Sequence, residues 1–136
     1  MKNPYKIPPP KEDVEQQQLF EWALWQSGAC PELDYLYHVP NGGLRNKAVA
    51  GKLKAQGVKS GVPDLCLPVA RNGFHGLYVE MKRKGETTSE RQKEWLAFLK
   101  EGGYRTAVCE GCEAAIIVIC DYMGIRPPVN IFRKGI

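Results

Sequence analysis

The clearest pattern of apolar and polar positions along the chain lies in residues 76–83. Apolar residues alternate there with polar or amphipathic ones, in the order Leu77, Tyr78, Val79, Glu80, Met81 and Lys82. A period of two is typical of a β-strand. The apolar run 65–69 precedes it, and the intervening Arg71-Asn72-Gly73 contains Asn-Gly, the strongest short hairpin signal. The pattern predicts a hairpin of two strands, 65–69 and 76–83.

Helical periodicity or capping marks four further segments. We expect helices from about Asp13 to Gly28, over 47–56, from Ser89 to Gly102, and over 113–123. The apolar stripe of the first helix consists of Val14, Leu19, Phe20, Ala23 and Leu24. Short runs at 35–39 and 104–109 predict two more strands. This order of elements predicts an α/β domain with a central mixed β-sheet flanked by helices.

The chain divides into three parts by composition. Residues 1–12 contain four prolines, which bar a helix, and we expect them to form a flexible arm. Residues 13–123 form one domain, and residues 124–136 form a C-terminal tail. With 136 residues, of which 43% are hydrophobic, the chain is long enough to bury a core without disulfide bonds.

Charge and cysteine content limit the classes of function. The net charge of +4 permits a polyanionic partner such as DNA without requiring one. The longest apolar run, 114–120, is too short to cross a bilayer, and no secretory signal is evident, so we expect no membrane partner and a cytoplasmic location. The five cysteines are then expected to be reduced thiols.

Three residues carry the candidate chemistry. Glu80 and Lys82 are two apart on one strand and point to the same face, and Asp64 begins the neighbouring strand. Two carboxylates held close repel each other unless a cation joins them, which points to Mg²⁺ or Mn²⁺. The alternative is structural: Glu80 and Lys82 would be a solvated pair, and Asp64 would close the turn that follows Val62-Pro63.

Five segments in this order resemble the VRR-NUC (virus-type replication-repair nuclease) domain of the PD-(D/E)xK nuclease superfamily. The resemblance extends from about Val14 to Tyr122. The segments are Glu15-Gln16, His38 to Gly43, Gly57 to Asp64, Val79 to Lys82, and Ser89 to Gln92. It implies a restriction-endonuclease-like core and a nuclease that hydrolyses DNA phosphodiesters.

The resemblance also implies roles for individual residues. Asp64, Glu80 and the backbone carbonyl of Met81 would be metal ligands, joined directly or through water by Glu15. Lys82 would position the attacking water or stabilise charge on the phosphate, and Gln92 would support the site. The residues expected to bind substrate are Asn41, His38, Arg45 and Lys59. Four of these residues have a local alternative: Glu15 suits a first helical turn, Gln92 a capping box with Ser89, Asn41 a turn, and His38 a satisfied imidazole.

The substrate implied is branched DNA, extending to four-way (Holliday) junctions. Symmetric cutting of a junction needs two active sites, so a homodimer is expected, with Trp22 and Trp25 suggested for the contact. The main alternative is a nucleic-acid-binding module without catalysis, and a second is a protein–protein adaptor. Cys109 and Cys112 form a C-x-x-C pair, but no second pair stands at a spacing suited to zinc.

Overall fold

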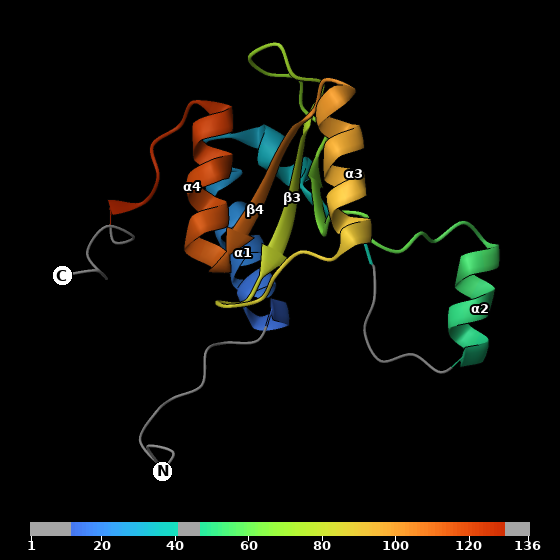
Figure 1. The fold of residues 1–136 in the computed structure, drawn as a ribbon. Helices are drawn as coiled ribbons and strands as arrows, with labels where there is room; N and C mark the ends of the chain where they lie inside the picture. The colour runs from blue at the N-terminus through green and yellow to red at the C-terminus, as the bar shows by residue number, and fades with distance from the viewer. Residues whose placement is uncertain (1–11, 41–46, 130–136) are drawn as a thin grey trace, which may run out of the picture.

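The computed structural model describes residues 12–40 and 47–129 of the chain, and these form one α/β unit (Figure 1). The helices are α1 (Glu12–Gln26), α2 (Lys47–Ala55), α3 (Glu90–Glu101) and α4 (Gly111–Met123), with a 3-10 helix η1 (Pro31–Tyr35). The strands are β1 (Tyr37–His38), β2 (Leu65–Leu67), β3 (Leu77–Lys82) and β4 (Arg105–Glu110). The expected α/β fold with a mixed sheet is confirmed.

The four strands form one sheet in the order β1-β2-β3-β4. β1 pairs antiparallel with β2, and β2 pairs antiparallel with β3, with Leu65 opposite Val79. The predicted hairpin is therefore confirmed, and Asn72 and Gly73 both have positive φ at its turn, as the hairpin signal requires. β3 and β4 are parallel and are joined through α3, so the sheet is mixed.

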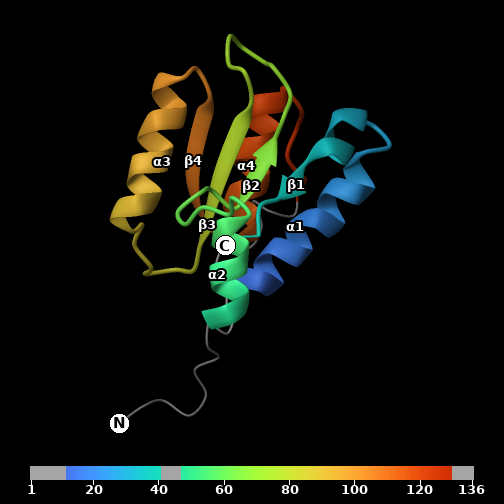
Figure 2. The same cartoon turned by 90° about the vertical axis from the view of Figure 1, so that its right-hand side faces the viewer.

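Helices cover both faces of the sheet. α1 and α4 pack together against one face, and α3 lies on the other, as Figure 2 shows edge-on. α2 projects away from this body, and Figure 1 shows it standing clear of the sheet. None of the residues of α2 is buried.

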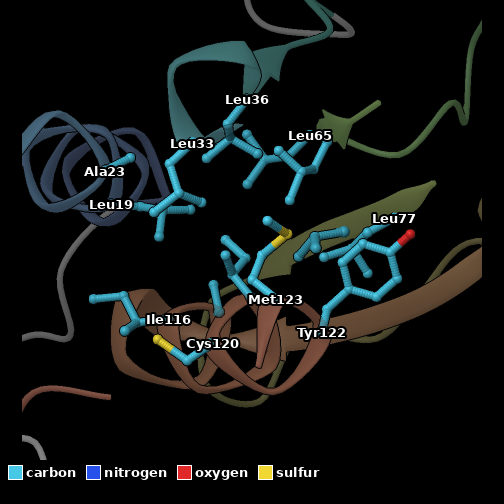
Figure 3. Close-up of a cluster of buried hydrophobic side chains, with 14 of the residues drawn as sticks. Leu19, Ala23, Leu33, Leu36, Leu65, Leu77, Ile116, Cys120, Tyr122 and Met123 are labelled. Atoms are coloured by element: carbon cyan, nitrogen blue, oxygen red, sulfur yellow. The ribbon is translucent and has the colours of Figure 1, made fainter. Parts of the chain in front are cut away.

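The core lies between the sheet and the pair α1 and α4 (Figure 3). Leu19 and Ala23 of α1 meet Ile116 and Cys120 of α4, and the 3-10 helix contributes Leu33. Tyr122 is fully buried, and its hydroxyl donates a hydrogen bond to the carbonyl oxygen of Val69. The apolar face of β3, predicted from its alternation, is part of this core.

Two local expectations are wrong. The segment expected as strand 35–39 is mostly 3-10 helix followed by a two-residue strand, because Pro31 starts a helical turn that points Leu33 and Leu36 inward. In α1, Val14 and Leu24 are exposed, because α4 covers a narrower stripe than the apolar pattern suggested. In the described part of the chain, no helix has the length and apolar character needed to cross a membrane.

Candidate active site

Asp64 stands at the end of the β2–β3 ladder. Extending the register by one pair from Leu65 and Val79 sets it opposite Glu80, and opposed residues project from the same face of a sheet. The backbone N–H of Met81 donates to Oδ2 of Asp64 (2.8 Å). The backbone carbonyl of Asp64 accepts from the N–H of Val39 (2.7 Å), which continues the ladder to the β1 side. The carboxylate of Asp64 is thus anchored beside Glu80 by the sheet itself.

Glu80 and Lys82 are buried, with 3% and 9% of their surfaces exposed. The Nζ of Lys82 lies 3.7 Å from Oε1 of Glu80. The solvated strand face considered from the sequence is therefore wrong, because α3 covers this side of the sheet. Burying an ionised group is costly unless it is paired or binds a metal, so two buried ionic side chains on one strand make this position a candidate functional site.

Gln92 connects the helix α3 to Glu80. Its Nε2 donates to Oε1 of Glu80 (2.9 Å), while its Oε1 accepts from the backbone N–H of Ser89 (2.8 Å). Oγ of Ser89 in turn accepts from the N–H of Gln92 (3.2 Å), which completes a capping box at the start of α3. The structure shows both the capping box and a contact of Gln92 with Glu80, because the two ends of one amide serve different partners. Its support of a metal site stays a prediction.

The loop that leads to Asp64 is docked on α3. Trp95 donates from Nε1 to the carbonyl oxygen of Ser60 (3.1 Å). Gly61 follows with φ +85°, and a Cβ placed on it would lie 2.6 Å from Cγ of Arg91. Only glycine fits this close approach. The sequence did not predict this contact, whose only local signal was Gly61 within Ser60-Gly61-Val62-Pro63.

Two tyrosines, Tyr37 and Tyr78, lie on the same face of the sheet as the carboxylates. Cys66 lies between Tyr37 and Tyr78 across three strands. A hydrogen bond with Cys66, together with burial, raises the pKa of Tyr37 to about 12, and burial, with the same cysteine, raises the pKa of Tyr78 to about 12. Both phenols stay protonated at neutral pH, so they add no negative charge beside Asp64 and Glu80.

Among the described residues, the carboxylate of Glu15, on α1, is hydrogen-bonded to the start of α4 rather than to Asp64 or Glu80. Its Oε2 accepts a hydrogen bond from the backbone N–H of Cys112, in the first turn of α4. A carboxylate is favoured at the amino end of a helix, where backbone N–H groups have no partner within the helix. The structure therefore shows Glu15 as a cap for α4, and its place in a metal shell stays a prediction.

Of the four residues expected to bind substrate, the structure describes His38 and Lys59. His38 is exposed, and its Nδ1 donates to the carbonyl oxygen of Asp64 (3.0 Å), so it is a satisfied imidazole next to the site. Lys59 is exposed in the loop before Asp64. Asn41 and Arg45 lie outside the described residues.

The donor set that the structure brings together suits a hard divalent cation. Asp64 and Glu80 offer carboxylate oxygens on one face. N–H and C=O of one strand residue point to the same side of the strand, so the carbonyl of Met81 faces the side on which Asp64 binds its N–H. Mg²⁺ commonly takes one or two carboxylates and completes its shell with water. Within the described ranges, no three His, Cys, Asp or Glu side chains are arranged to hold a metal, so any such site relies on this smaller set.

Both cysteines of the C-x-x-C pair are buried in the fold. Cys109 is the one buried residue of β4 and Cys112 lies in the first turn of α4, and both are buried free thiols. Burial raises the pKa of Cys109 to about 11. Thiolates are the reactive form of cysteine, so a protonated buried thiol at this position is chemically quiet at neutral pH.

Comparisons with known proteins agree with this geometry. The model of the VRR-NUC domain family matches residues 11–113, which is most of the chain. A solved structure described as a VRR_NUC domain protein has 34% sequence identity and a TM-score of 0.74, with 86% of this chain and 91% of that chain covered. No protein of curated function matches. The chain is therefore a member of the VRR-NUC domain family of nucleases.

Proposed function

We propose that this protein is a Mg²⁺-dependent endodeoxyribonuclease that hydrolyses DNA phosphodiesters, with Mn²⁺ able to replace Mg²⁺. The observation that carries the proposal is the burial of Glu80 and Lys82 on one strand, with the carboxylate of Asp64 held by the backbone N–H of Met81 between them. A binding module has no need for two carboxylates in a covered position, because they repel the phosphates that it must attract. A hydrolase that recruits a cation does need them.

Each residue then has a role that follows from its position. Asp64, Glu80 and the carbonyl of Met81 would hold the ion, which when bound acts as a Lewis acid and lowers the pKa of a bound water. Lys82 places a fixed positive charge where negative charge develops on the phosphate oxygens. Gln92 orients the carboxylate of Glu80 through its amide, as ligand-supporting residues do in metal sites.

We propose branched DNA, including four-way junctions, as the preferred substrate, and a homodimer as the working form. The basic residues before the site, Lys47, Lys52, Lys54 and Lys59, are all exposed and would contact phosphates without reading base sequence. A two-fold dimer would present two active sites to a symmetric junction. A monomeric mass in light scattering at working concentration would contradict the dimer while leaving phosphodiester hydrolysis open.

The test is cleavage of labelled junction, flap, duplex and single-stranded DNA with Mg²⁺, Mn²⁺ or EDTA. We expect cleavage with either metal, none with EDTA, and the fastest cutting on branched DNA. Asp64→Asn should abolish cleavage and retain DNA binding, whereas Asp34→Asn, a change of an exposed carboxylate on the 3-10 helix η1, should cut normally. If Asp64→Asn cuts like the unmodified protein, the mechanism is wrong.

The same panel distinguishes the main alternative, a nucleic-acid-binding module without catalysis. That module would bind DNA equally well with Mg²⁺ or EDTA and would leave every substrate intact. Binding is measured by fluorescence anisotropy on the same labelled DNA, so one set of samples reports both properties.

A further inference from the structure

Tyr37 is an aromatic residue on the face of the sheet that carries Asp64 and Glu80. It lies opposite Cys66 in the β1–β2 pair, and Cys66 lies opposite Tyr78 in the β2–β3 pair. Opposed residues project from the same face of a sheet, and Glu80 follows Tyr78 by two positions, so these side chains share one face. We call Tyr37, Cys66 and Tyr78 the tyrosine row. The row lies about 6.5 Å along the strands from Asp64 and Glu80.

Tyr37 is anchored to the sheet and accessible at the same time. A hydrogen bond joins its phenol to Cys66, which is only 4% exposed, whereas Tyr37 itself is 48% exposed. At the other end of the row Tyr78 is half-buried, and the ring of Tyr104 packs edge-on against it with 5.3 Å between the ring centroids. In Figure 2, α3 lies toward the β4 side of this face, and β1 and β2 are seen beside it. An aromatic side chain that is already held in place loses little conformational entropy when a ligand covers it.

The tyrosine row differs in chemistry from the charged residues beside it. It consists of two phenols that stay protonated and a thiol, whereas Asp64, Glu80 and Lys82 supply the charges. A nucleic acid has the same division, because each charged phosphate is joined through a sugar to an aromatic base. A phosphate held at the charged residues would place a base of the same strand over Tyr37. Aromatic side chains accept the π-face of any base, so such a contact does not depend on base sequence.

A base can reach the ring of Tyr37 only when it has left the duplex. Inside a double helix both faces of a base are covered by its neighbours, and unstacking costs least where the nucleotide is already single-stranded. We propose that Tyr37 stacks on an unpaired nucleobase next to the scissile phosphate. This inference rests on the proposed function and gives its preference for branched DNA a specific residue, since flaps and opened branch points supply unpaired nucleotides. Tyr37 touches the substrate and transfers no proton.

The first test measures the binding of two single strands in EDTA by fluorescence anisotropy. One strand is oligothymidylate, and the other is an abasic strand of the same length and charge. Tyr37→Leu should weaken the binding of oligothymidylate about tenfold and leave the binding of the abasic strand unchanged, because only the first strand has bases to stack. Tyr37→Phe keeps the ring and should bind like the unmodified protein. Tyr35→Leu removes a tyrosine that is 67% exposed on η1, outside the row, and should also bind normally.

The two strands separate stacking from a structural role of Tyr37. If the ring only supported the fold, Tyr37→Leu would lower the melting temperature and would weaken the binding of both strands equally. The inference is overturned by that result, by unchanged binding of oligothymidylate to Tyr37→Leu, or by a loss in Tyr37→Phe as large as that in Tyr37→Leu. Equal affinity of the unmodified protein for the two strands would overturn it without any variant.

A cleavage experiment with Mg²⁺ then locates the stacked base. Single abasic nucleotides are placed on either side of the mapped cut in a flap substrate. The effect of Tyr37→Leu on kcat/KM should vanish at the one position whose base stacks on Tyr37 and should persist at the others. Failure of the unmodified protein to cut would contradict the proposed function, while the binding comparison, made without metal, would still decide the role of Tyr37. Normal cutting with an effect of Tyr37→Leu that no abasic position removes would overturn the stacking alone.

Discussion

Helices α2 and α3 have similar lengths but are held in opposite ways. α3 begins with a complete capping box, buries Leu99, and contacts Glu80 of the sheet through Gln92 and the loop before Asp64 through Trp95. α2 buries none of its residues and stands clear of the sheet (Figure 1). A nine-residue helix without tertiary packing is marginal in water, so α2 depends on its own local propensity.

The difference separates two functions within one small domain. Side chains around α3 are held by packing and by hydrogen bonds with two partners, which suits groups that must meet a reacting phosphate within a fraction of an ångström. The lysines of α2 are positioned only by their own helix, which suits contacts with a flexible, charged backbone whose path varies. Four experiments test this difference between α2 and α3.

The largest effect is expected from Lys82→Met. Cleavage should fall by about 10²–10³-fold, because a buried charge opposite the phosphate is lost. Stability should also fall, by about 3 kcal/mol without metal, because Glu80 is left buried without its cationic partner. Single-turnover cleavage and urea unfolding measure the two effects, and Lys84→Met, at an exposed position, should change neither. Cleavage by Lys82→Met within threefold of the unmodified rate would remove this lysine from the mechanism.

Gly61→Ala should destabilise the protein by about 1–3 kcal/mol, because its φ is positive and the new Cβ would approach the side chain and backbone of Arg91. Cleavage should fall as well, because Asp64 is only three residues away. Gly51→Ala is the matched control in α2: nothing lies within 4 Å of its added Cβ, and we expect a gain in local helicity without loss of cleavage. Equal stability of the two variants in urea unfolding would show that the loop is not clamped on α3.

Ser89→Ala and Gln92→Ala distinguish the contribution of the capping box to stability from the contribution of Gln92 to the position of Glu80. Each should cost about 1 kcal/mol of stability, because each removes one half of the cap. Only Gln92→Ala should also reduce cleavage, by about tenfold, and raise the Mg²⁺ concentration needed for half-maximal rate. The discriminating measurement is a Mg²⁺ titration of the cleavage rate. If both variants need the same Mg²⁺ concentration, Gln92 acts on the helix alone.

The smallest effect is expected from Lys52→Ala with Lys54→Ala in α2. DNA binding should weaken several-fold at low salt, and the slope of log affinity against log salt should decrease by about 1 to 2. The maximal cleavage rate and the melting temperature should stay the same, because neither side chain is packed against the body. A loss of maximal rate at unchanged salt slope would instead give α2 a catalytic task.

Local chemistry explains why much of the fold was predictable. Asn72-Gly73 specified the turn, the alternation in 77–82 specified the strand, and Ser89 with Gln92 specified the start of α3; each signal acts within a few residues. The 3-10 helix was missed because the aromatic run at 35–39 suits a strand, whereas the inward direction of Leu33 and Leu36 depends on packing against α1. Local signals carry no information on such packing.

The proximity of Asp64 and Glu80 was predictable from the sequence, and their environment was less so. Asp64 and Glu80 were expected to be neighbours, and the ladder sets them opposite each other. The burial of Glu80 and Lys82 was not predictable, because it depends on α3 crossing that face of the sheet. For the same reason the contact of Trp95 with Ser60 and the cap that Glu15 provides for α4 required the structure.

The amide at position 92 limits which sequences can build this site. Capping boxes accept glutamate as readily as glutamine at their third helical position. Here Oε1 of Gln92 is used by Ser89 and its nitrogen faces the carboxylate of Glu80, so a glutamate would put a third negative oxygen against that carboxylate. Natural variants of this protein should therefore keep an amide at this position even where the surrounding helix sequence drifts. A glutamate that arose there would require a compensating change at Glu80.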